Sequence, residues 1–169
     1  MGVELTGTHS TSSSAPIDEA AVPVVPWLDE RTAALVRATT ATLAQRHPEL
    51  RAVILYGSVA RHEERPITDR HPSDVDLLLL LDLDPGQDYI AYDRHIALYE
   101  SAGLADARYP YAPREVQLML AWRDLADWDE TFVESVARDG ILLFARSPLP
   151  APLLPIEERS RQAHQAASS

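Results

Sequence analysis

The chain contains no cysteine, which excludes disulfide frameworks, thiol nucleophiles and cysteine-ligated zinc. It has no apolar run long enough to span a bilayer. Its first residues, MGVELTGTHSTSSSAPIDEA, lack the basic and hydrophobic regions of a secretory signal. These absences predict a cytoplasmic protein without membrane segments.

Basic residues are also scarce, because 15 Lys and Arg stand against 26 Asp and Glu, for a formal net charge of −11. Nucleic-acid binders normally present a basic face. We therefore do not expect nucleic acid to be the main partner.

The length of 169 residues suits one domain with a hydrophobic core. Residues 1–24 are rich in Ser, Thr and Ala, and we expect them to form a disordered N-terminal arm. Residues 148–169 begin with closely spaced prolines and continue as a polar stretch, which predicts a linker or a loosely held tail. The folded domain is expected at 25–147.

Apolar spacing within 25–147 predicts helices alternating with short strands. The expected order is helix 26–47, strand 51–57, strand 74–84, helix 88–103, strand 114–122, helix 126–140 and strand 141–145. The unbroken leucines of 77–81 predict a central strand that is buried on both faces. The pattern indicates an α/β (α+β) sandwich, with a mixed sheet and helices mainly on one face.

Two carboxylates stand at the start of this leucine-rich strand. Asp74 and Asp76 are two residues apart, so their side chains leave the same face of the strand, with Cβ atoms roughly 6–7 Å apart. Like charges held so close raise each other's cost of ionisation, and a divalent cation such as Mg²⁺ removes that conflict. Acids on a solvated strand edge are the alternative interpretation.

The preceding strand ends in Gly57-Ser58, followed by Arg61. Glycine permits a sharp bend that brings backbone amides close to a ligand, while Ser58 and Arg61 offer a hydroxyl and a positive charge. A simple turn is the alternative. Together with the paired aspartates, the bend indicates a nucleoside triphosphate bridged to Mg²⁺.

The combination GSVAR…SDVDLLL resembles the minimal nucleotidyltransferases of the DNA polymerase β superfamily, the MNT type of HEPN/MNT toxin–antitoxin pairs. The resemblance covers about Val53 to Phe144, and REVQLML and ARDGILLF are similar to later family strands. It implies a polymerase β-like sheet. It also implies the site residues: Gly57, Ser58 and Arg61 for the triphosphate, and Asp74, Asp76 and Glu115 for one or two Mg²⁺ ions, with Glu115 as a ligand or general base.

The chain departs from the family pattern at three places. His62 stands where the family usually has glycine, and Glu115 stands where aspartate is commoner. The fifteen residues from Val59 to Ser73 make the connecting loop longer than usual. These departures leave every required chemical group in place.

The resemblance implies transfer of a nucleoside monophosphate, AMP from ATP, to a hydroxyl acceptor. Larger members of the family carry an acceptor-binding domain, which we expect a partner to supply here; the family suggests a tyrosine of a HEPN-type toxin, with this chain as antitoxin. One alternative acceptor is a small hydroxyl compound such as an aminoglycoside, which Glu63, Glu64 and Asp69 could attract. Another alternative is a non-catalytic module that neutralises its partner by binding. The base preference and the oligomeric state stay open.

Several other residues have both a structural and a functional interpretation. Glu115 could instead pair with Arg114 or Arg108. The remaining candidates are His62, His71 and His95 as ligands, Trp122 and Trp128 as base-stacking residues, and Arg65 and Arg70 as contacts to the β- and γ-phosphates. For the histidines, for Trp128 and for the loop arginines we favour the structural interpretation, while Trp122 stays open.

Overall fold

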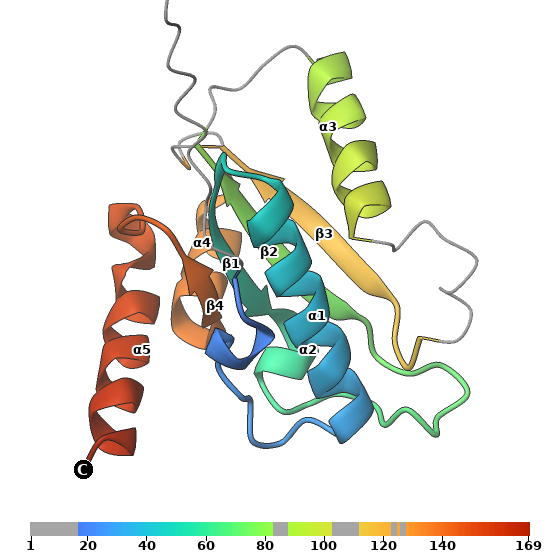
Figure 1. The fold of residues 1–169 in the computed structure, drawn as a ribbon, viewed down its shortest axis with the longest axis vertical. Coiled ribbons are helices and arrows are strands. Elements are labelled where there is room, and N and C mark those ends of the chain that lie inside the picture. The colour runs from blue at the N-terminus through green and yellow to red at the C-terminus, as the bar shows by residue number, and fades with distance from the viewer. Residues whose placement is uncertain (1–16, 83–87, 103–111, 123–124, 126–127) are drawn as a thin grey trace, which may run out of the picture.

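The computed structural model describes residues 17–82, 88–102, 112–122, 125 and 128–169, and the side chains of 88–92 lie outside this description. The elements in chain order are η1 (Glu19–Ala21), α1 (Glu30–Arg46), β1 (Leu50–Tyr56), α2 (Gly57–Ala60), β2 (Val75–Leu81), α3 (Asp88–Ser101), β3 (Val116–Ala121), α4 (Glu130–Asp139), β4 (Ile141–Ala145), η3 (Ala151–Leu153) and α5 (Leu154–Ala167). Figure 1 shows their arrangement around one sheet.

The four strands form a mixed sheet in the order β3-β2-β1-β4. Strand β1 pairs antiparallel with β2 and with β4, whereas β2 and β3 run parallel. Leu77 to Leu81 of β2 are all buried. The predictions of a mixed α+β sheet and of a central leucine-rich strand are therefore confirmed.

Helices cover both faces of this sheet, so the expectation that they lie mainly on one face is wrong. Leu77, Leu79 and Leu81 pack in one cluster with α1 and α3. Leu78 and Leu80 point to the other face and pack with α4, η3 and α5. Figure 1 shows α1 and α4 on opposite sides of the sheet. A strand that is apolar on both faces needs cover on both, and the C-terminal segment supplies part of it.

The two long helices expected at 26–47 and 126–140 begin at aspartate caps. Asp29 accepts hydrogen bonds from the amide and the hydroxyl of Thr32, at 2.9 and 2.6 Å. Asp129 accepts from the amide of Phe132 at 3.0 Å. These bonds satisfy amides that the first turn of a helix leaves free.

Residues at both edges of the expected domain pack into the core, whereas residues 1–16 of the expected arm lie outside the described part of the chain. Val22 and Val25 are buried in the core beside α1. Leu153 and Ile156 are buried beneath α4, and α5 continues to Ala167. Proline fits the first turn of a helix, so the prolines that suggested a linker also allow α5 to begin there. The division at 24 and 147 stays a prediction, but the flanking residues contribute to the core.

No helix in the described part of the chain is long and apolar enough to cross a membrane.

The packing of α5 makes a prediction about stability. Ile156 is 1% exposed and Leu154, two residues earlier, is 47% exposed. Ile156→Ala should lower the free energy of unfolding by about 2–4 kcal/mol, because it leaves a cavity beneath the helix. Urea unfolding measures this change, with Leu154→Ala as the matched control. Equal, small losses in both variants would show that α5 is not part of the cooperative fold.

Candidate functional site

The bend after β1 forms one side of the site. Gly57 has φ +78, in the region that favours glycine, and begins the four-residue helix α2. The first amides of any helix have no partner within it, so the bend offers N–H donors beside the Ser58 hydroxyl. Such a short helix has little dipole, and the donors of this bend are its amides and that hydroxyl.

The carboxylate of Asp76 lies directly against this bend. Tyr56 is the cross-strand partner of Asp76 in the β1–β2 pair, and Gly57 is the next residue after Tyr56. A Cβ atom on Gly57 would clash with Oδ2 of Asp76, so this carboxylate would have to move away from the bend if another residue stood there. The glycine therefore serves two purposes, because it permits the positive φ and leaves room for the carboxylate.

Asp74 and Asp76 flank the buried Val75 at the start of β2, and both are half-buried. Burial, and after it the nearby Asp74 carboxylate, raises the pKa of Asp76 to about 6, against the opposing effect of Arg61. Arg61 follows α2 and also forms an ion pair with Glu63 at 2.9 Å. The two aspartates and Arg61 thus influence one another electrostatically.

Glu115 lies beside Asp74 on the neighbouring strand. Val75 is in register with Val116, and the Val75 amide donates to the Glu115 carbonyl at 2.8 Å, so the residues preceding both strands are adjacent. The Glu115 side chain is exposed. Burial raises the pKa of Tyr99, and the negative charges of Glu115 and Asp76 raise it further.

Within the described residues, no group of three or more His, Asp or Glu side chains could hold a metal ion. Glu115 therefore does not complete a three-carboxylate centre in this conformation. The pair Asp74 and Asp76 still fits Mg²⁺, since this ion is commonly held by one or two carboxylates together with substrate phosphates. The room that Gly57 leaves beside Asp76 agrees with this fit.

Arg114 fixes the backbone of the loop that leads into Asp74, a role that the sequence analysis did not predict. Its guanidinium is buried and donates to Thr32 Oγ1 at 3.0 Å, to the Arg65 carbonyl at 2.6 Å and to the Ser73 carbonyl at 2.9 Å. It also lies 3.7 Å from the Asp29 carboxylate. The suggested pairing of Glu115 with Arg114 is thus replaced by contacts to the loop and to α1, while Arg108 lies outside the described residues.

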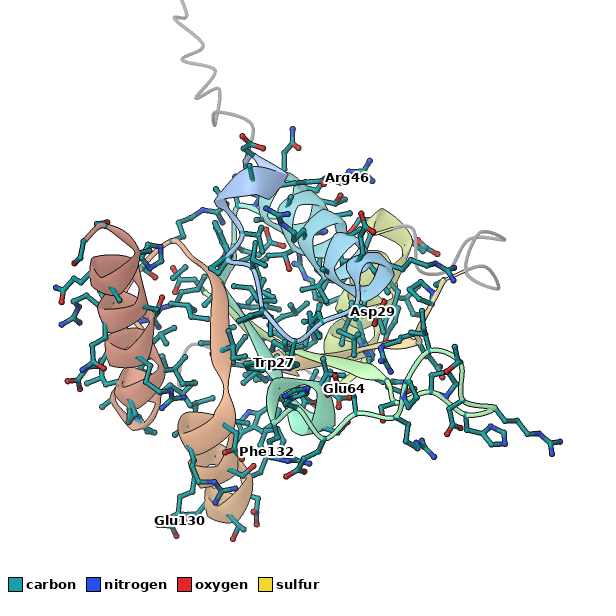
Figure 2. The ribbon with its side chains drawn as sticks, turned by 90° about the horizontal axis from the view of Figure 1, so that it is seen from below. Trp27, Asp29, Arg46, Glu64, Glu130 and Phe132 are labelled. Atoms are coloured by element: carbon teal, nitrogen blue, oxygen red, sulfur yellow. The ribbon has the colours of Figure 1, made fainter. Side chains whose placement is uncertain are left out.

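Aromatic side chains pack around α2 and the end of β1. Trp27 donates from its indole to the Val59 carbonyl at 2.8 Å and stacks on His62 at 5.3 Å between ring centroids. Figure 2 shows Trp27 and Glu64 close to α2. His62 has φ +58, which explains why glycine suits this position in the family that the motif resembles. The structural interpretation of His62 therefore holds.

The other aromatic and histidine candidates also have structural contacts. His95 lies 2.8 Å from the Leu118 carbonyl and packs edge-to-face on Tyr99. Trp128 stacks on Phe132, whose ring meets Tyr56 edge-to-face. Burial, with Asp76 as a further cause, raises the pKa of Tyr56 to about 12. Tyr56 is thus an aromatic neighbour of the site that the sequence interpretation did not include.

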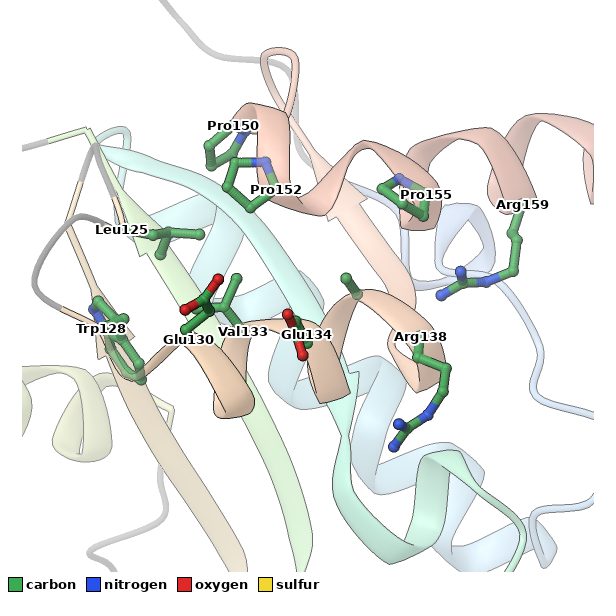
Figure 3. A pocket seen from close by; sticks show the side chains of 11 residues that line it. Leu125, Trp128, Glu130, Val133, Glu134, Arg138, Pro150, Pro152, Pro155 and Arg159 are labelled. Carbon is green, nitrogen blue, oxygen red and sulfur yellow. The ribbon is translucent and has the colours of Figure 1, made fainter.

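A large apolar cavity of ≈ 890 Å³ lies between α4 and the η3–α5 segment. Figure 3 shows Trp128 and Val133 on one side and Pro150, Pro152 and Pro155 on the other. None of the residues predicted to bind the triphosphate or the metal lines it, whereas the base-stacking candidate Trp128 does.

A smaller polar cavity of ≈ 380 Å³ adjoins the acidic residues. Its lining includes Asp74, Glu115, Arg65, Arg70, His71 and Arg114. The polar chemistry of the site therefore lies at this smaller cavity, not at the large apolar one.

A scan against protein-family models finds no match, and neither does a search of curated proteins. Among solved structures, a Sulfolobus solfataricus protein assigned as a predicted nucleotidyltransferase is similar at 18% identity and a TM-score of 0.42, over 67% of this chain and 79% of its own.

Chains from two toxin–antitoxin crystal structures are also similar. One was solved with AMP-PNP and matches at 16% identity and a TM-score of 0.39, over 82% of this chain and 89% of that one. The other holds a tri-AMPylated Shewanella oneidensis HEPN toxin with an MNT antitoxin, at 15% identity and a TM-score of 0.38, over 82% and 88%. Since identity and superposition are low, the function is argued from the chain's own residues.

The raised pKa of Asp76 predicts a pH-dependent stability. Its pKa is about 6 in the fold and about 3.9 in an unfolded chain, so proton uptake favours the folded state. This stabilisation is complete below pH about 4 and is lost as the pH rises through about 6. Asp76→Asn removes the ionisation and should therefore raise the free energy of unfolding at pH 8 by about 1–2 kcal/mol, a range reduced for the solvent exposure of the side chain.

Urea unfolding of both proteins at pH 4, 6 and 8 measures this effect, and the gain should fade at pH 4. Glu158→Gln on the exposed face of α5 removes the same charge elsewhere and serves as the control. A loss of stability in Asp76→Asn that is equal at all three pH values would contradict the assignment.

Proposed function

We propose that this chain is a Mg²⁺-dependent nucleotidyltransferase, which transfers a nucleoside monophosphate, AMP from ATP, to a hydroxyl acceptor. One observation carries the proposal: the Asp76 carboxylate lies against the bare Cα of Gly57, with Asp74 beside it. A phosphate-binding bend and a pair of metal-binding carboxylates thus share one place, as nucleotide chemistry requires.

Each residue has a role in this proposal. The amides of the Gly57-Ser58 bend, the Ser58 hydroxyl and the Arg61 guanidinium hold the triphosphate. Asp74 and Asp76 hold Mg²⁺, which supplies neutralisation of the phosphate charge when it is bound. Because these donors are fixed by the fold, they orient the α-phosphate without reorganisation during the reaction.

The transfer is an in-line displacement at the α-phosphate. The acceptor oxygen forms a bond to phosphorus, the bond to the β-phosphate oxygen breaks, and pyrophosphate leaves. Glu115, which adjoins Asp74, takes the proton of the acceptor hydroxyl as general base. Its exposed position leaves it accessible to an acceptor that arrives from outside the chain.

For the acceptor we propose a tyrosine of a HEPN-type toxin, with this chain as its antitoxin. The motif resemblance suggests this partner, and the net charge of −11 suits docking to a basic RNA-cleaving protein. One of the complexes named above holds a tri-AMPylated HEPN toxin with an MNT antitoxin.

The charges near the site weigh against an aminoglycoside acceptor. Glu63 forms an ion pair with Arg61, which balances part of its charge. The cavity beside Asp74 is lined by Arg65 and Arg70, which repel a polycation. A purely binding role would use the same surface without transfer, and the labelling experiment below distinguishes the two roles.

Incubation with labelled ATP, Mg²⁺ and the co-purified partner tests the proposal. Asp74→Ala should lower labelling of the partner by about 100-fold or more, because it removes a proposed metal ligand. Glu158→Gln, an equal charge change on α5, should leave labelling unchanged. Equal labelling by Asp74→Ala and the unaltered chain would overturn the metal assignment. Inhibition of the partner without any label, from all three proteins, would establish the non-catalytic role instead.

A further inference from the structure

The polar cavity beside Asp74 lies between the long loop and the start of β3. Asp74 and Glu115 form its acidic side, whereas Arg65, Arg70 and His71 of the loop form its basic side. At ≈ 380 Å³ it has room for a small polar group.

The loop that carries these arginines is held by hydrogen bonds at its neck and at its tip. At the neck, the Arg65 amide donates to Ser73 Oγ at 2.8 Å, and buried Arg114 donates to the carbonyls of both residues. At the tip, the Asp69 carboxylate accepts from the His71 amide at 2.8 Å. The insertion that distinguishes this chain therefore presents its charges from a constrained backbone.

The two loop arginines have charge to offer a ligand. Arg114, the third arginine that lines the cavity, lies beside Asp29 and donates to loop carbonyls. Within the part of the chain that the structure describes, no carboxylate lies at ion-pair distance from Arg65 or Arg70. Guanidinium groups bind phosphate strongly, often through two parallel hydrogen bonds.

The strand order sets the place of this cavity relative to the phosphate bend. Strand β2, with the aspartates, lies between β1, which ends directly before Gly57, and β3, which Glu115 precedes. The bend and the cavity thus lie on opposite sides of the aspartate pair. In an in-line displacement the leaving and attacking oxygens are also on opposite sides of the phosphorus.

We propose that Arg65 and Arg70 form a phosphate-binding subsite in this cavity, on the acceptor side of the aspartates. This inference rests on the proposed nucleotidyl transfer. The strand order favours an acceptor-side source, and the proposed transfer supplies one: an AMP already attached to the partner carries a phosphate beside its ribose hydroxyls. The β- or γ-phosphate of the donor nucleotide is the second source with the same chemistry.

Binding of inorganic phosphate, followed by ³¹P NMR at low salt, tests the subsite without relying on activity. Arg65→Ala and Arg70→Ala should each raise the dissociation constant about tenfold, the effect of losing one charge-assisted contact. Arg161→Ala, on the exposed face of α5, makes the same change in net charge and should alter it less than about twofold. Because the replaced side chains are exposed, thermal midpoints should match that of the unaltered chain.

A second titration in saturating non-hydrolysable ATP analogue and Mg²⁺ separates the two sources. Phosphate that still binds, in an arginine-dependent way, assigns the subsite to the acceptor, whereas phosphate displaced by the analogue assigns it to the donor triphosphate. Loop variants that bind phosphate as Arg161→Ala does would overturn the subsite. Loss of the subsite would not overturn the proposed transfer, because the transfer is tested separately, by comparing the labelling of the partner by Asp74→Ala with that by the unaltered chain.

Discussion

The close approach of the Asp76 carboxylate to the Cα of Gly57 is the constraint on which the proposed site depends. It requires glycine twice, for the positive φ and for the missing Cβ, and it fixes β1 and β2 in the register that pairs Tyr56 with Asp76. Burial and the neighbouring Asp74 make this position unfavourable for a lone negative charge, as the raised pKa of Asp76 indicates. A bound cation with phosphate would remove that cost, so the same arrangement that weakens the free protein favours the proposed ligand.

The rest of the fold holds this approach in place. The two-sided burial of β2 fixes the strand between two helical layers, and the C-terminal helix provides part of the second layer. Arg114 connects the start of α1, the neck of the long loop and the residue before Asp74 through one buried guanidinium. The same guanidinium lies 3.7 Å from the Asp29 carboxylate, so the buried charge has a partner as well as three hydrogen-bond acceptors. The loop arginines, Asp74 and Glu115 thereby line a single polar cavity.

The sequence predicted the parts of this structure that local patterns encode. The leucine run identified the central strand, apolar spacing identified α1 and α4, and the glycine identified the bend at 57. Local sequence patterns failed where contacts between residues far apart in the chain determine the structure. Prolines near 150 suggested a linker, although the apolar Leu153 and Ile156 among them are core residues. The partners of Arg114 lie up to 82 residues away, so no spacing rule points to its role. The catalytic and metal-binding roles of Asp74, Asp76 and Glu115 stay predictions.

A crystal structure with Mn²⁺ and a non-hydrolysable ATP analogue tests whether Asp74 and Asp76 bind metal beside the Gly57-Ser58 bend, because anomalous scattering identifies the metal position directly. We expect a metal ion about 2.1 Å from carboxylate oxygens of both Asp74 and Asp76, with phosphate oxygens accepting hydrogen bonds from the amides of the Gly57-Ser58 bend. A metal bound elsewhere on the chain, or a triphosphate that does not touch the bend, would contradict it.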